Sequence, residues 1–489
     1  MGFRGRRIAI GTAIAMIAIA LFAPGASAAD KRNADLQRYA RDTWASFVAM
    51  TDENSGLPAD SLDANGARSV QTSTTNIGAY MWSALVAERL GIISHSELVD
   101  RLSKTITTLD HMERYSPGGQ YYNWYDYRNG EKLTYWPPTG APLKPILSSV
   151  DNGWLATGLR VVANSVPELG ARARAIYDGM DFGFYYRPSA NRIAFYYAPS
   201  DGDSPCCYDT VVSESRIASY IGISKGELPP KEYYGTWRSF PDTCDWSWQE
   251  TKPLGVHRTY YGVDVFEGAY PYAGMRVTPS WGGSMFEALM PALFVPEDTW
   301  APNSWGVNHP VTVQSQIHHG MDEAKYHYWG FSPSNTPEGG YSVYGVDGIG
   351  MDPNGNPSNE DKTLVDHGFA GCPGRPAQPD PPASAYTNGV VTPHAAFLAL
   401  RFARGAALND IARLAQNFAG MYGKWGFRDS VNVQTGRVSD SYLSLDQGMI
   451  MAAIGNALGS DFLRKAFATP DFEQVVRPVI SPEQFGARR

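Results

Sequence analysis

The sequence predicts a mostly α-helical fold with long connecting loops and a few short β-strands. Apolar residues recur at helical spacing in seven segments. Stretches rich in Gly, Pro and Tyr separate these segments, and there is no strand–helix alternation with the spacing of a parallel sheet. Helices are expected at 77–90, 154–162, 217–223, 285–294, 395–402, 411–421 and 449–458, and short strands in the loops, for example near 192–197.

The first 28 residues have the pattern of a secretory signal peptide. Basic residues at positions 4, 6 and 7 precede an apolar run at 8–22, and Ala26-Ser27-Ala28 supplies the small residues of a cleavage site. A membrane anchor is the alternative, but the run is shorter than the about 20 residues that span a bilayer. No later stretch is long and apolar enough to span. We therefore expect a secreted protein without a membrane span after cleavage.

Residues 29–489 are predicted to form one domain. This length exceeds the usual size of a single core, but no low-complexity linker divides it. The most Pro-rich segment, 372–382, is short and lies within an otherwise continuous pattern, so we expect a loop there. A monomer is the expected state.

The composition argues against nucleic acid and favours carbohydrate as the ligand. The formal net charge is −8, and it becomes −11 without the three arginines of the signal peptide. Phosphate binding relies on clustered Lys and Arg, and the chain has no basic tract. Aromatic residues make up 12 % of the chain and gather in polar stretches such as 121–125 and 246–248. Large cores also use aromatic residues, but rings exposed in loops can pack against the C–H faces of sugars.

The four cysteines, Cys206, Cys207, Cys244 and Cys372, predict disulfides because the chain is expected to be exported. Neighbouring cysteines rarely bond to each other, so we expect Cys206 and Cys207 to pair with the other two. Four cysteines allow three connectivities, and the sequence does not choose among them. Neither a CxxC nor an HExxH motif is present. We expect neither a metal nor a cofactor.

Several predicted helices begin with a polar cluster that carries a carboxylate or a hydroxyl. The clusters are 72–76, 148–152, 213–215 and 440–442. Capping of the helix N-termini explains part of this pattern, since Ser, Thr, Asp and Asn are good N-caps. A sharper interpretation is that the helices form a ring whose N-termini share one rim. The polar side chains would then face a common cleft.

Five motifs occur in an order that resembles one known family. They are Thr72-Ser73-Thr74-Thr75-Asn76-Ile77-Gly78, Ser213-Glu214-Ser215-Arg216, Gly283-Ser284-Met285-Phe286-Glu287, Trp329-Gly330-Phe331-Ser332-Pro333-Ser334 and Asp440-Ser441-Tyr442-Leu443-Ser444-Leu445-Asp446-Gln447-Gly448. Together, over about 39–458, they resemble the glucoamylase-like family that includes bacterial endo-β-1,2-glucanases and parts of cyclic β-1,2-glucan synthases. The resemblance implies an (α/α)6 toroid, inverting hydrolysis of a glycosidic bond, no metal and β-1,2-glucan as the substrate class.

The resemblance also assigns roles to particular carboxylates. It implies that Glu214 is the general acid and that Asp446 belongs to the base side, with Asp440 as a competitor. Asp151 opens a helix and is expected to line the subsites. Two departures bear on the substrate: Pro333 stands where the synthase branch has glutamate, and the insert at 347–385 is longer than the family loop.

Inverting hydrolysis requires a protonated carboxyl and an ionised one about 6.5–9.5 Å apart. The acid needs a raised pKa, which apolar walls supply. Each candidate also has a structural interpretation: Glu214 as the ion-pair partner of Arg216, Asp446 as a helix cap, and Glu287 as a hydrogen-bond acceptor for a neighbouring backbone. We expect the substrate to be bound by Asp151, Glu287, Arg216, Trp124, Trp281, Trp329 and Tyr442.

Three other functions stay open at this stage. A hydrolase of another envelope glycan, such as an arabinan or a galactan, fits the same scaffold. A polysaccharide lyase needs an acidic substrate, which an acidic chain repels. A non-catalytic glycan-binding protein would keep the aromatic residues but would not need the carboxylates Glu214, Asp440 and Asp446.

Overall fold

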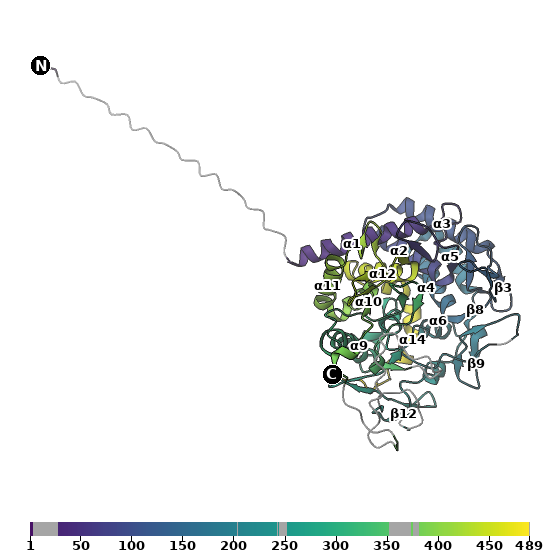
Figure 1. The fold of residues 1–489 in the computed structure, drawn as a ribbon. Helices are drawn as coiled ribbons and strands as arrows, with labels where there is room; N and C mark the ends of the chain where they lie inside the picture. Colours follow the sequence, from purple (N-terminus) through teal and green to yellow (C-terminus); the bar gives the residue numbers. More distant parts are fainter. Residues whose placement is uncertain are drawn as a thin grey trace.

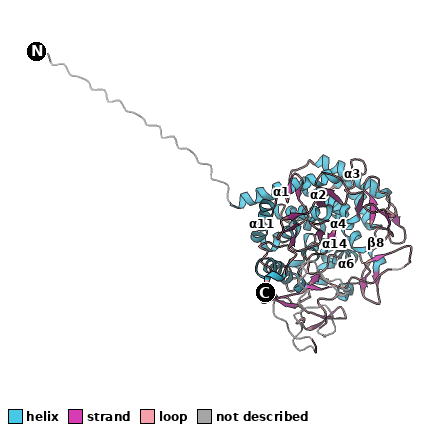
Figure 2. Cartoon of the chain, in the orientation of Figure 1, coloured by secondary structure: helices cyan, strands magenta, loops and turns pink. Residues whose placement is uncertain are grey.

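The computed structural model describes residues 1–2, 28–202, 204–241, 243, 252–351, 373–374 and 381–488. Helices predominate within these ranges, as predicted, and the strands are short (Figures 1 and 2). The helices are α1 (Ala28–Met50), α2 (Thr74–Arg89), α3 (His95–His111), α4 (Ser149–Ser165), α5 (Pro167–Asp178), α6 (Arg216–Ser224), α7 (Met285–Leu289), α8 (Glu297–Trp300), α9 (Trp305–His318), α10 (Pro393–Leu398), α11 (Leu400–Asn417), α12 (Ser444–Leu458), α13 (Phe462–Phe467) and α14 (Pro470–Ile480).

The strands pair in twos, apart from one group of three. Around the ends of the central helices these are β1 (Ser61–Asp63) with β25 (Ser441–Leu443), β2 (Gln71–Ser73) with β5 (Trp124–Asp126), β8 (Leu147–Ser148) with β11 (Tyr196–Tyr197), β16 (Ser280–Trp281) with β19 (Gly350–Met351), β17 (Ser334–Asn335) with β18 (Tyr341–Ser342), and β20 (Val390–Val391) with β23 (Val431–Asn432) and β24 (Arg437–Val438). The other pairs are β3 (Arg114–Tyr115) with β4 (Gln120–Tyr121), β6 (Tyr135–Trp136) with β7 (Ala141–Pro142), β9 (Tyr186–Arg187) with β10 (Arg192–Ile193), β12 (His257–Tyr260) with β13 (Val263–Phe266), β14 (Tyr270–Tyr272) with β15 (Met275–Val277), and β21 (Tyr422–Gly423) with β22 (Gly426–Phe427).

Six helices pack against one another in a closed series. Helix α2 packs on α4, α4 on α6, α7 on α10, α10 on α12, and α12 returns to α2. Arg216, at the start of α6, closes the remaining step because its guanidinium donates to the carbonyls of Glu287 and Ala288 in α7. We call α2, α4, α6, α7, α10 and α12 the inner helices. Helices α1, α3, α5, α9, α11 and α14 each pack against one or more of them.

Short strands lead into the N-termini of most inner helices. Strands β2, β8, β20 and β25 end one or two residues before α2, α4, α10 and α12 begin, and β16 precedes α7. Serine side chains cap three of these helices: Ser73 accepts from the backbone NH of Asn76, Ser148 from that of Asp151, and Ser284 from that of Glu287. Each cap satisfies an NH group that has no partner within the helix. The predicted capping is therefore present at α2 and α4, whereas α6 and α12 have no side-chain cap and the cap of α7 was not predicted.

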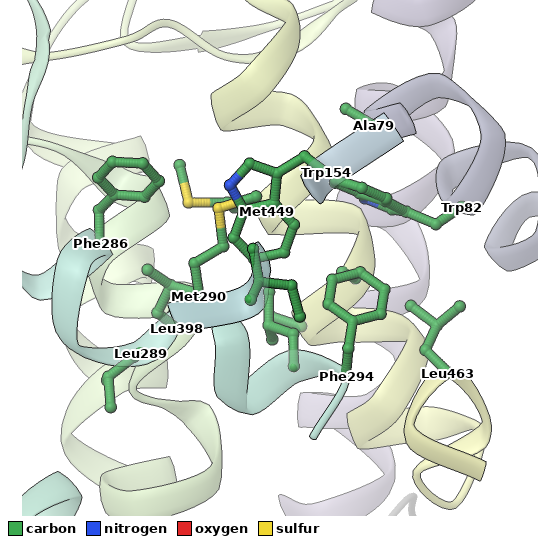
Figure 3. Close-up of a cluster of buried hydrophobic side chains, with 14 of the residues drawn as sticks. Ala79, Trp82, Trp154, Phe286, Leu289, Met290, Phe294, Leu398, Met449 and Leu463 are labelled. Atoms are coloured by element: carbon green, nitrogen blue, oxygen red, sulfur yellow. The ribbon is translucent and has the colours of Figure 1, made fainter. Parts of the chain in front are cut away.

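The centre of the inner helices is a packed hydrophobic core (Figure 3). Trp82 of α2 lies edge-on to Trp154 of α4, with 6.0 Å between ring centroids, and both rings contact Phe294. Met449 of α12 and Leu398 of α10 point into the same cluster. Buried rings of this size account for much of the apolar surface that stabilises a fold.

Three predicted helical segments differ from the structure at their ends. The segment 285–294 is helical only to Leu289, because Pro291 has no amide hydrogen and a 3-10 turn, Pro291–Leu293, follows. The segment 395–402 spans the junction of α10 and α11 at Ala399. Helix α11 ends at Asn417, four residues before the predicted end. No helix in the described part of the chain is long and apolar enough to cross a membrane.

The cysteine prediction is wrong for the two residues that the structure describes. Cys206 and Cys207 form a disulfide with each other. The peptide bond between them is cis, and their Cα atoms lie 3.1 Å apart, whereas the prediction took neighbouring residues to be poorly placed for the torsion of a disulfide. Cys244, Cys372 and most of the predicted signal peptide lie outside the described residues.

Helices α2 and α4 approach closely through two glycines. A Cβ added to Gly78 would lie 2.4 Å from the carbonyl oxygen of Trp154, and one added to Gly158 would lie 2.8 Å from the Cα of Gly78. Both distances are below van der Waals contact with backbone atoms, which do not move aside easily. The close approach brings the N-terminal turns of the two helices together.

We expect Gly78→Ala to lower the free energy of unfolding by about 1–3 kcal/mol, because it overpacks this crossing. Gly405→Ala is the matched control, since its added Cβ meets nothing within 4 Å in α11. The control should raise stability by roughly 0.5–1 kcal/mol, because alanine favours helix. Urea unfolding followed by circular dichroism measures both, and equal effects would contradict the close-packing argument.

Candidate functional site

Carboxylates gather where the N-termini of the inner helices meet. Asp151 is the third residue of α4, Glu287 the third of α7 and Asp446 the third of α12, while Glu214 lies two residues before α6. Unpaired NH groups and the helix dipole make this end of a helix favourable for negative charge. The arrangement brings together four of the residues that the sequence analysis selected.

Glu214 and Glu287 form the first carboxylate pair. The backbone NH of Glu214 donates to Oε2 of Glu287 at 2.7 Å. The indole NH of Trp154 donates to Oε2 of Glu214, so the core of the inner helices supports the side chain directly. Burial raises the pKa of Glu214 well above its ordinary value, and the charge of Glu287 raises it further. The raised pKa favours the protonated form of Glu214, which is the form that a general acid requires.

Asp151 lies beside this pair on α4. Its Oδ1 accepts from the hydroxyl of Thr75 in α2 at 2.6 Å. The side-chain NH2 of Asn123 donates to Oδ2 of Asp151 at 2.9 Å. The side-chain oxygen of Asn123 accepts from the indole NH of Trp124 at 3.0 Å. Burial raises the pKa of Asp151. These bonds fix Asp151 between α2 and the β5 strand that carries Trp124.

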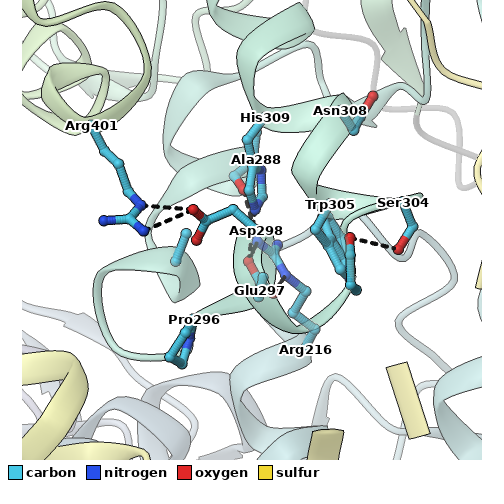
Figure 4. A network of polar contacts seen from close by, with 12 residues as sticks. Arg216, Ala288, Pro296, Glu297, Asp298, Ser304, Trp305, Asn308, His309 and Arg401 are labelled. Atoms are coloured by element: carbon cyan, nitrogen blue, oxygen red, sulfur yellow. Dashed lines mark hydrogen bonds and ion pairs between the residues drawn. The ribbon is translucent and has the colours of Figure 1, made fainter. Parts of the chain in front are cut away.

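Arg216 serves the structure rather than a ligand, as Figure 4 shows. Nε and Nη2 bind the carboxylate of Glu297 at 2.6 and 3.0 Å, and both side chains are almost fully buried. The remaining N–H groups donate to the carbonyls of Ser213, Glu287 and Ala288. All five donors of the guanidinium are thereby used. The sequence offered Glu214 as the ion-pair partner of Arg216, but the structure assigns that place to Glu297.

Asp446 and Asp429 form a second carboxylate pair, and each side chain is 2 % exposed. Burial raises the pKa of Asp446 to about 7, and the pKa of Asp429 is raised by burial and by the charge of Asp446. Asp429 Oδ2 also accepts from the backbone NH of Asn335 at 2.5 Å. Two carboxyls this close share a proton, since both cannot ionise freely.

His394 and Asp60 flank the second pair. Nδ1 of His394, in the first turn of α10, lies 3.0 Å from Oδ2 of Asp446. Burial lowers the pKa of this imidazole to about 4, so it is neutral at pH 7. Asp60 accepts from the side-chain amide of Asn76 at 2.8 Å, and its charge raises the pKa of Asp446.

Tyr341 lies on the strand pair that contacts the second carboxylate pair. It is 54 % exposed and lies opposite Asn335 in the pairing of β18 with β17. The backbone NH of Asn335 donates to Asp429 Oδ2. The side-chain amide of Asn335 donates to Ser441 Oγ at 2.6 Å and so ties this hairpin to β25. The hairpin thus holds an accessible tyrosine near the second pair.

Partly exposed aromatic rings border the first pair. Trp281 lies edge-on to Tyr208 and Phe195, at 5.8 and 5.9 Å. The charges of Glu214 and Asp151 raise the pKa of Tyr208, after the larger effect of burial. Trp124 packs edge-on against Trp136 at 5.3 Å. The structure therefore places the predicted Trp281 and Trp124 beside the carboxylates.

Three other predicted residues lie elsewhere. Trp329 is 3 % exposed and Tyr442 is 4 % exposed, so both belong to the core. Asp440 is on the surface, with its carboxylate 75 % exposed and 3.4 Å from Arg428. Asp440 is separated from Asp446 by the extended strand β25, because Asp440 precedes the strand and Asp446 follows it in α12.

The sequence analysis missed Asp429, Asp60, His394, Tyr341 and Tyr208. Asp429 and Tyr208 lie in turns or loops, and Tyr341 lies on a two-residue strand, so no helical pattern singles them out. A local signal was available for His394, because proline favours the first position of a helix and Pro393 is the first residue of α10. Among the described residues, no group of three or more His, Cys, Asp or Glu has the arrangement of a metal site.

Comparisons with known proteins place the chain among carbohydrate-related sequences. The profile of a family described as putative glucoamylase matches residues 210–470, and a family of unknown function matches residues 38–183. A cyclic β-(1,2)-glucan synthase of Rhizobium meliloti is 24 % identical over 88 % of this chain. The chain spans only 18 % of that synthase.

Solved structures share the fold. A putative glucoamylase of Bacteroides uniformis superimposes with a TM-score of 0.66 at 15 % identity, covering 92 % of this chain and 97 % of the other. An endo-β-1,2-glucanase of Chitinophaga pinensis, in complex with sophorotriose and glucose, gives 0.65 at 16 % identity and covers 93 % and 99 %. At these identities the likeness establishes the fold, and the chemistry rests on the site.

We expect Arg216→Met to lower the free energy of unfolding by about 3–5 kcal/mol, because it leaves Glu297 charged and buried without its partner. Adding Glu297→Gln should restore part of that loss, since the uncompensated charge is then gone. Denaturant unfolding of the two variants measures the difference. A double variant as unstable as the single one would contradict an ion-pair role for Arg216.

Proposed function

The chain belongs to the putative glucoamylase family, and from that premise we propose that it is a secreted, inverting glycoside hydrolase of β-1,2-glucan or a related β-glucan. Secretion rests on the signal-peptide pattern of residues 1–28. The substrate class rests on the relatives: one is a β-1,2-glucan synthase and another an endo-β-1,2-glucanase. We also propose that the closed series of inner helices is the inner ring of an (α/α)6 toroid.

The observation that carries the reaction class is the presence of two separate carboxylate pairs at one site. Inversion needs one carboxyl that donates a proton to the leaving oxygen and another that activates water across the sugar. Glu214 has the raised pKa and the fixed orientation of the acid.

Asp446 takes the base side in this proposal. Its carboxylate accepts the proton of the attacking water, and Asp429 can share that proton through the contact between the two carboxyls. His394 is neutral and lies next to Oδ2, so it does not neutralise Asp446; its Nδ1 is hydrogen-bonded with the hydroxyl of Thr392. Trp281 and Tyr208 offer rings beside Glu214 for packing against a glucosyl unit.

The decisive experiment is the release of reducing ends from linear β-1,2-glucan, within a panel that includes other β-glucans, arabinan and galactan. Glu214→Gln and Asp446→Asn should each lower kcat by about 10²–10⁴-fold, because each removes a proton-transfer group. Asp440→Asn is the matched control and should retain activity, since its carboxylate is exposed and outside the pairs. The first-formed product should carry the α-anomer by proton NMR, as inversion of a β-linkage requires.

Each result has a defined meaning for the proposal. Hydrolysis of another polysaccharide alone would overturn the substrate and keep the reaction class. Products with an unsaturated sugar would indicate a lyase. Full activity of Glu214→Gln in a folded protein would overturn the assignment of the acid, and the absence of products from the whole panel would support a glycan-binding protein.

The charge of Glu287 gives a separate pH prediction. Glu287 raises the pKa of Glu214, and an acid must be protonated to work, so activity falls as pH rises through that pKa. Glu287→Gln removes the negative charge, lowers the pKa of Glu214 and should move the alkaline limb of kcat/KM to lower pH. Glu473→Gln changes a partly exposed side chain of α14 and should leave the alkaline limb in place. A limb that is unchanged in Glu287→Gln would show that Glu214 is not the group that titrates.

A further inference from the structure

A pocket lies at the end of the inner helices that is opposite to the carboxylates. Its volume is about 300 Å³, and it is lined by the last turns of α10 and α12, the first turn of α11, the chain after α7, and α13. Asp446 and His394 lie in the first turns of α12 and α10, whereas this pocket lies beside the C-termini of the same two helices. It is therefore distinct from the candidate active site.

Three guanidinium groups line this pocket. Arg401 and Arg404 come from α11, and Arg464 from α13. Only two carboxylates balance them: Asp298 binds Arg401 at 2.8 Å and Arg464 at 3.3 Å, and Asp461 binds Arg401 at 3.0 Å. Three positive charges against two negative ones leave an excess of positive charge at the pocket.

Arg404 is the arginine of this pocket that makes the fewest hydrogen bonds to the described residues. Its one interaction with the described residues is a hydrogen bond from Nη2 to the side-chain oxygen of Asn33, at 2.8 Å. A guanidinium has five N–H donors in a planar fork. Four donors of Arg404 therefore have no acceptor among the described residues, and this partly exposed group is open to a ligand in the pocket.

Arg464 is a charged side chain held almost without solvent. It is 4 % exposed, and its Nε donates to the carbonyl of Ala292 at 2.7 Å. Burial lowers the pKa of Arg464, and the charge of Arg401 acts in the same direction. An anion placed between these groups would meet charged donors, one of them almost fully buried, and charge-assisted hydrogen bonds are stronger than neutral ones.

One wall of the pocket is held in a rare backbone conformation. Ser460 and Asp461 both have φ of 58°, in the left-handed region that residues other than glycine rarely adopt. The NH of Asp461 donates to the carbonyl of Asn456 at 3.0 Å, and its carboxylate holds Arg401. Such conformations persist where the surroundings enforce them, and they gather at binding sites.

We propose that this pocket binds a small phosphate-type anion, either inorganic phosphate or a phosphate monoester. Guanidinium forks match the oxygens of phosphate, and three of them from two helices can surround one group. The volume is at the lower end for small-molecule pockets. Apolar residues of α10 and α12 line the rest of the pocket and suit the organic part of a monoester.

The same contacts connect the pocket to the carboxylates. Arg401 and Arg464 bind Asp298, and the next residue, Glu297, holds Arg216 (Figure 4). Arg216 in turn holds the carbonyls of Ser213 and Glu287, on either side of the Glu214–Glu287 contact. An anion that draws Arg401 away from Asp298 therefore changes the support of Glu214. This effect on activity rests on the proposed function, whereas binding of the anion does not.

Isothermal titration with sodium phosphate tests the site in the whole protein, at constant ionic strength and with sodium chloride as the reference salt. We expect saturable binding of one phosphate per chain, weakened about 10-fold or more by Arg404→Ala, since a charged hydrogen bond is lost. Lys465→Ala is the control: it removes an exposed positive charge on α13 that does not line the pocket. The affinity of Lys465→Ala for phosphate should stay within about twofold of that of the parent protein, because surface charges away from a site contribute little.

The outcomes separate binding from regulation. No saturation below about 10 mM phosphate, a range of binding too weak to be specific, would overturn the proposal, as would equal losses in Arg404→Ala and Lys465→Ala. Tighter binding of glycerol phosphate than of phosphate would support a monoester, and equal binding would support inorganic phosphate. Saturable binding without a change in kcat would keep the site and exclude the connection to Glu214. Thermal unfolding of both variants without ligand confirms that they fold.

Discussion

The structure depends on one constraint, which is that the inner helices direct their N-termini to the same place. A helix N-terminus presents unpaired NH groups and partial positive charge. One such end can hold a carboxylate, and several together can hold a group of them in a partly desolvated space. Asp151, Glu287 and Asp446 each occupy the third position of an inner helix, so the chemistry of the site follows from the packing of the helices.

The hydrophobic core and the site are parts of one assembly. Trp154 lies between Trp82 and Phe294 in the core, and its indole NH meets Glu214. The backbone around Glu214 is held from the other side by Arg216, whose charge is neutralised by buried Glu297. Glu214 is thus fixed by contacts that also stabilise the fold, which explains how a carboxyl can remain buried beside another carboxyl.

The helical class and four site residues were predictable because they depend on local patterns. Periodic apolar residues predicted the helices, and the polar cluster at 148–152 placed Asp151 at the start of one of them. Glu214 and Asp446 were selected through the motifs that resemble the family, and Glu287 through its place in an apolar helix. Asp429 and Tyr341 depend instead on tertiary contacts, since Asn335 brings their segments together across about a hundred residues of sequence. Such pairings leave no local trace in one sequence. Trp329 and Tyr442 were selected for residue type alone, which does not distinguish a core ring from an exposed one.

The strand that leads into each inner helix has a consequence for how such a protein can change. A pair of short strands fixes the register of the chain just before the helix begins, so the position of the carboxylate does not depend on the loop beyond the pair. The chain between β19 and β20, residues 352–389, can therefore gain or lose residues while β16 and β19 stay paired. Loops that meet the ligand and residues that perform the reaction can thus evolve at different rates within one scaffold.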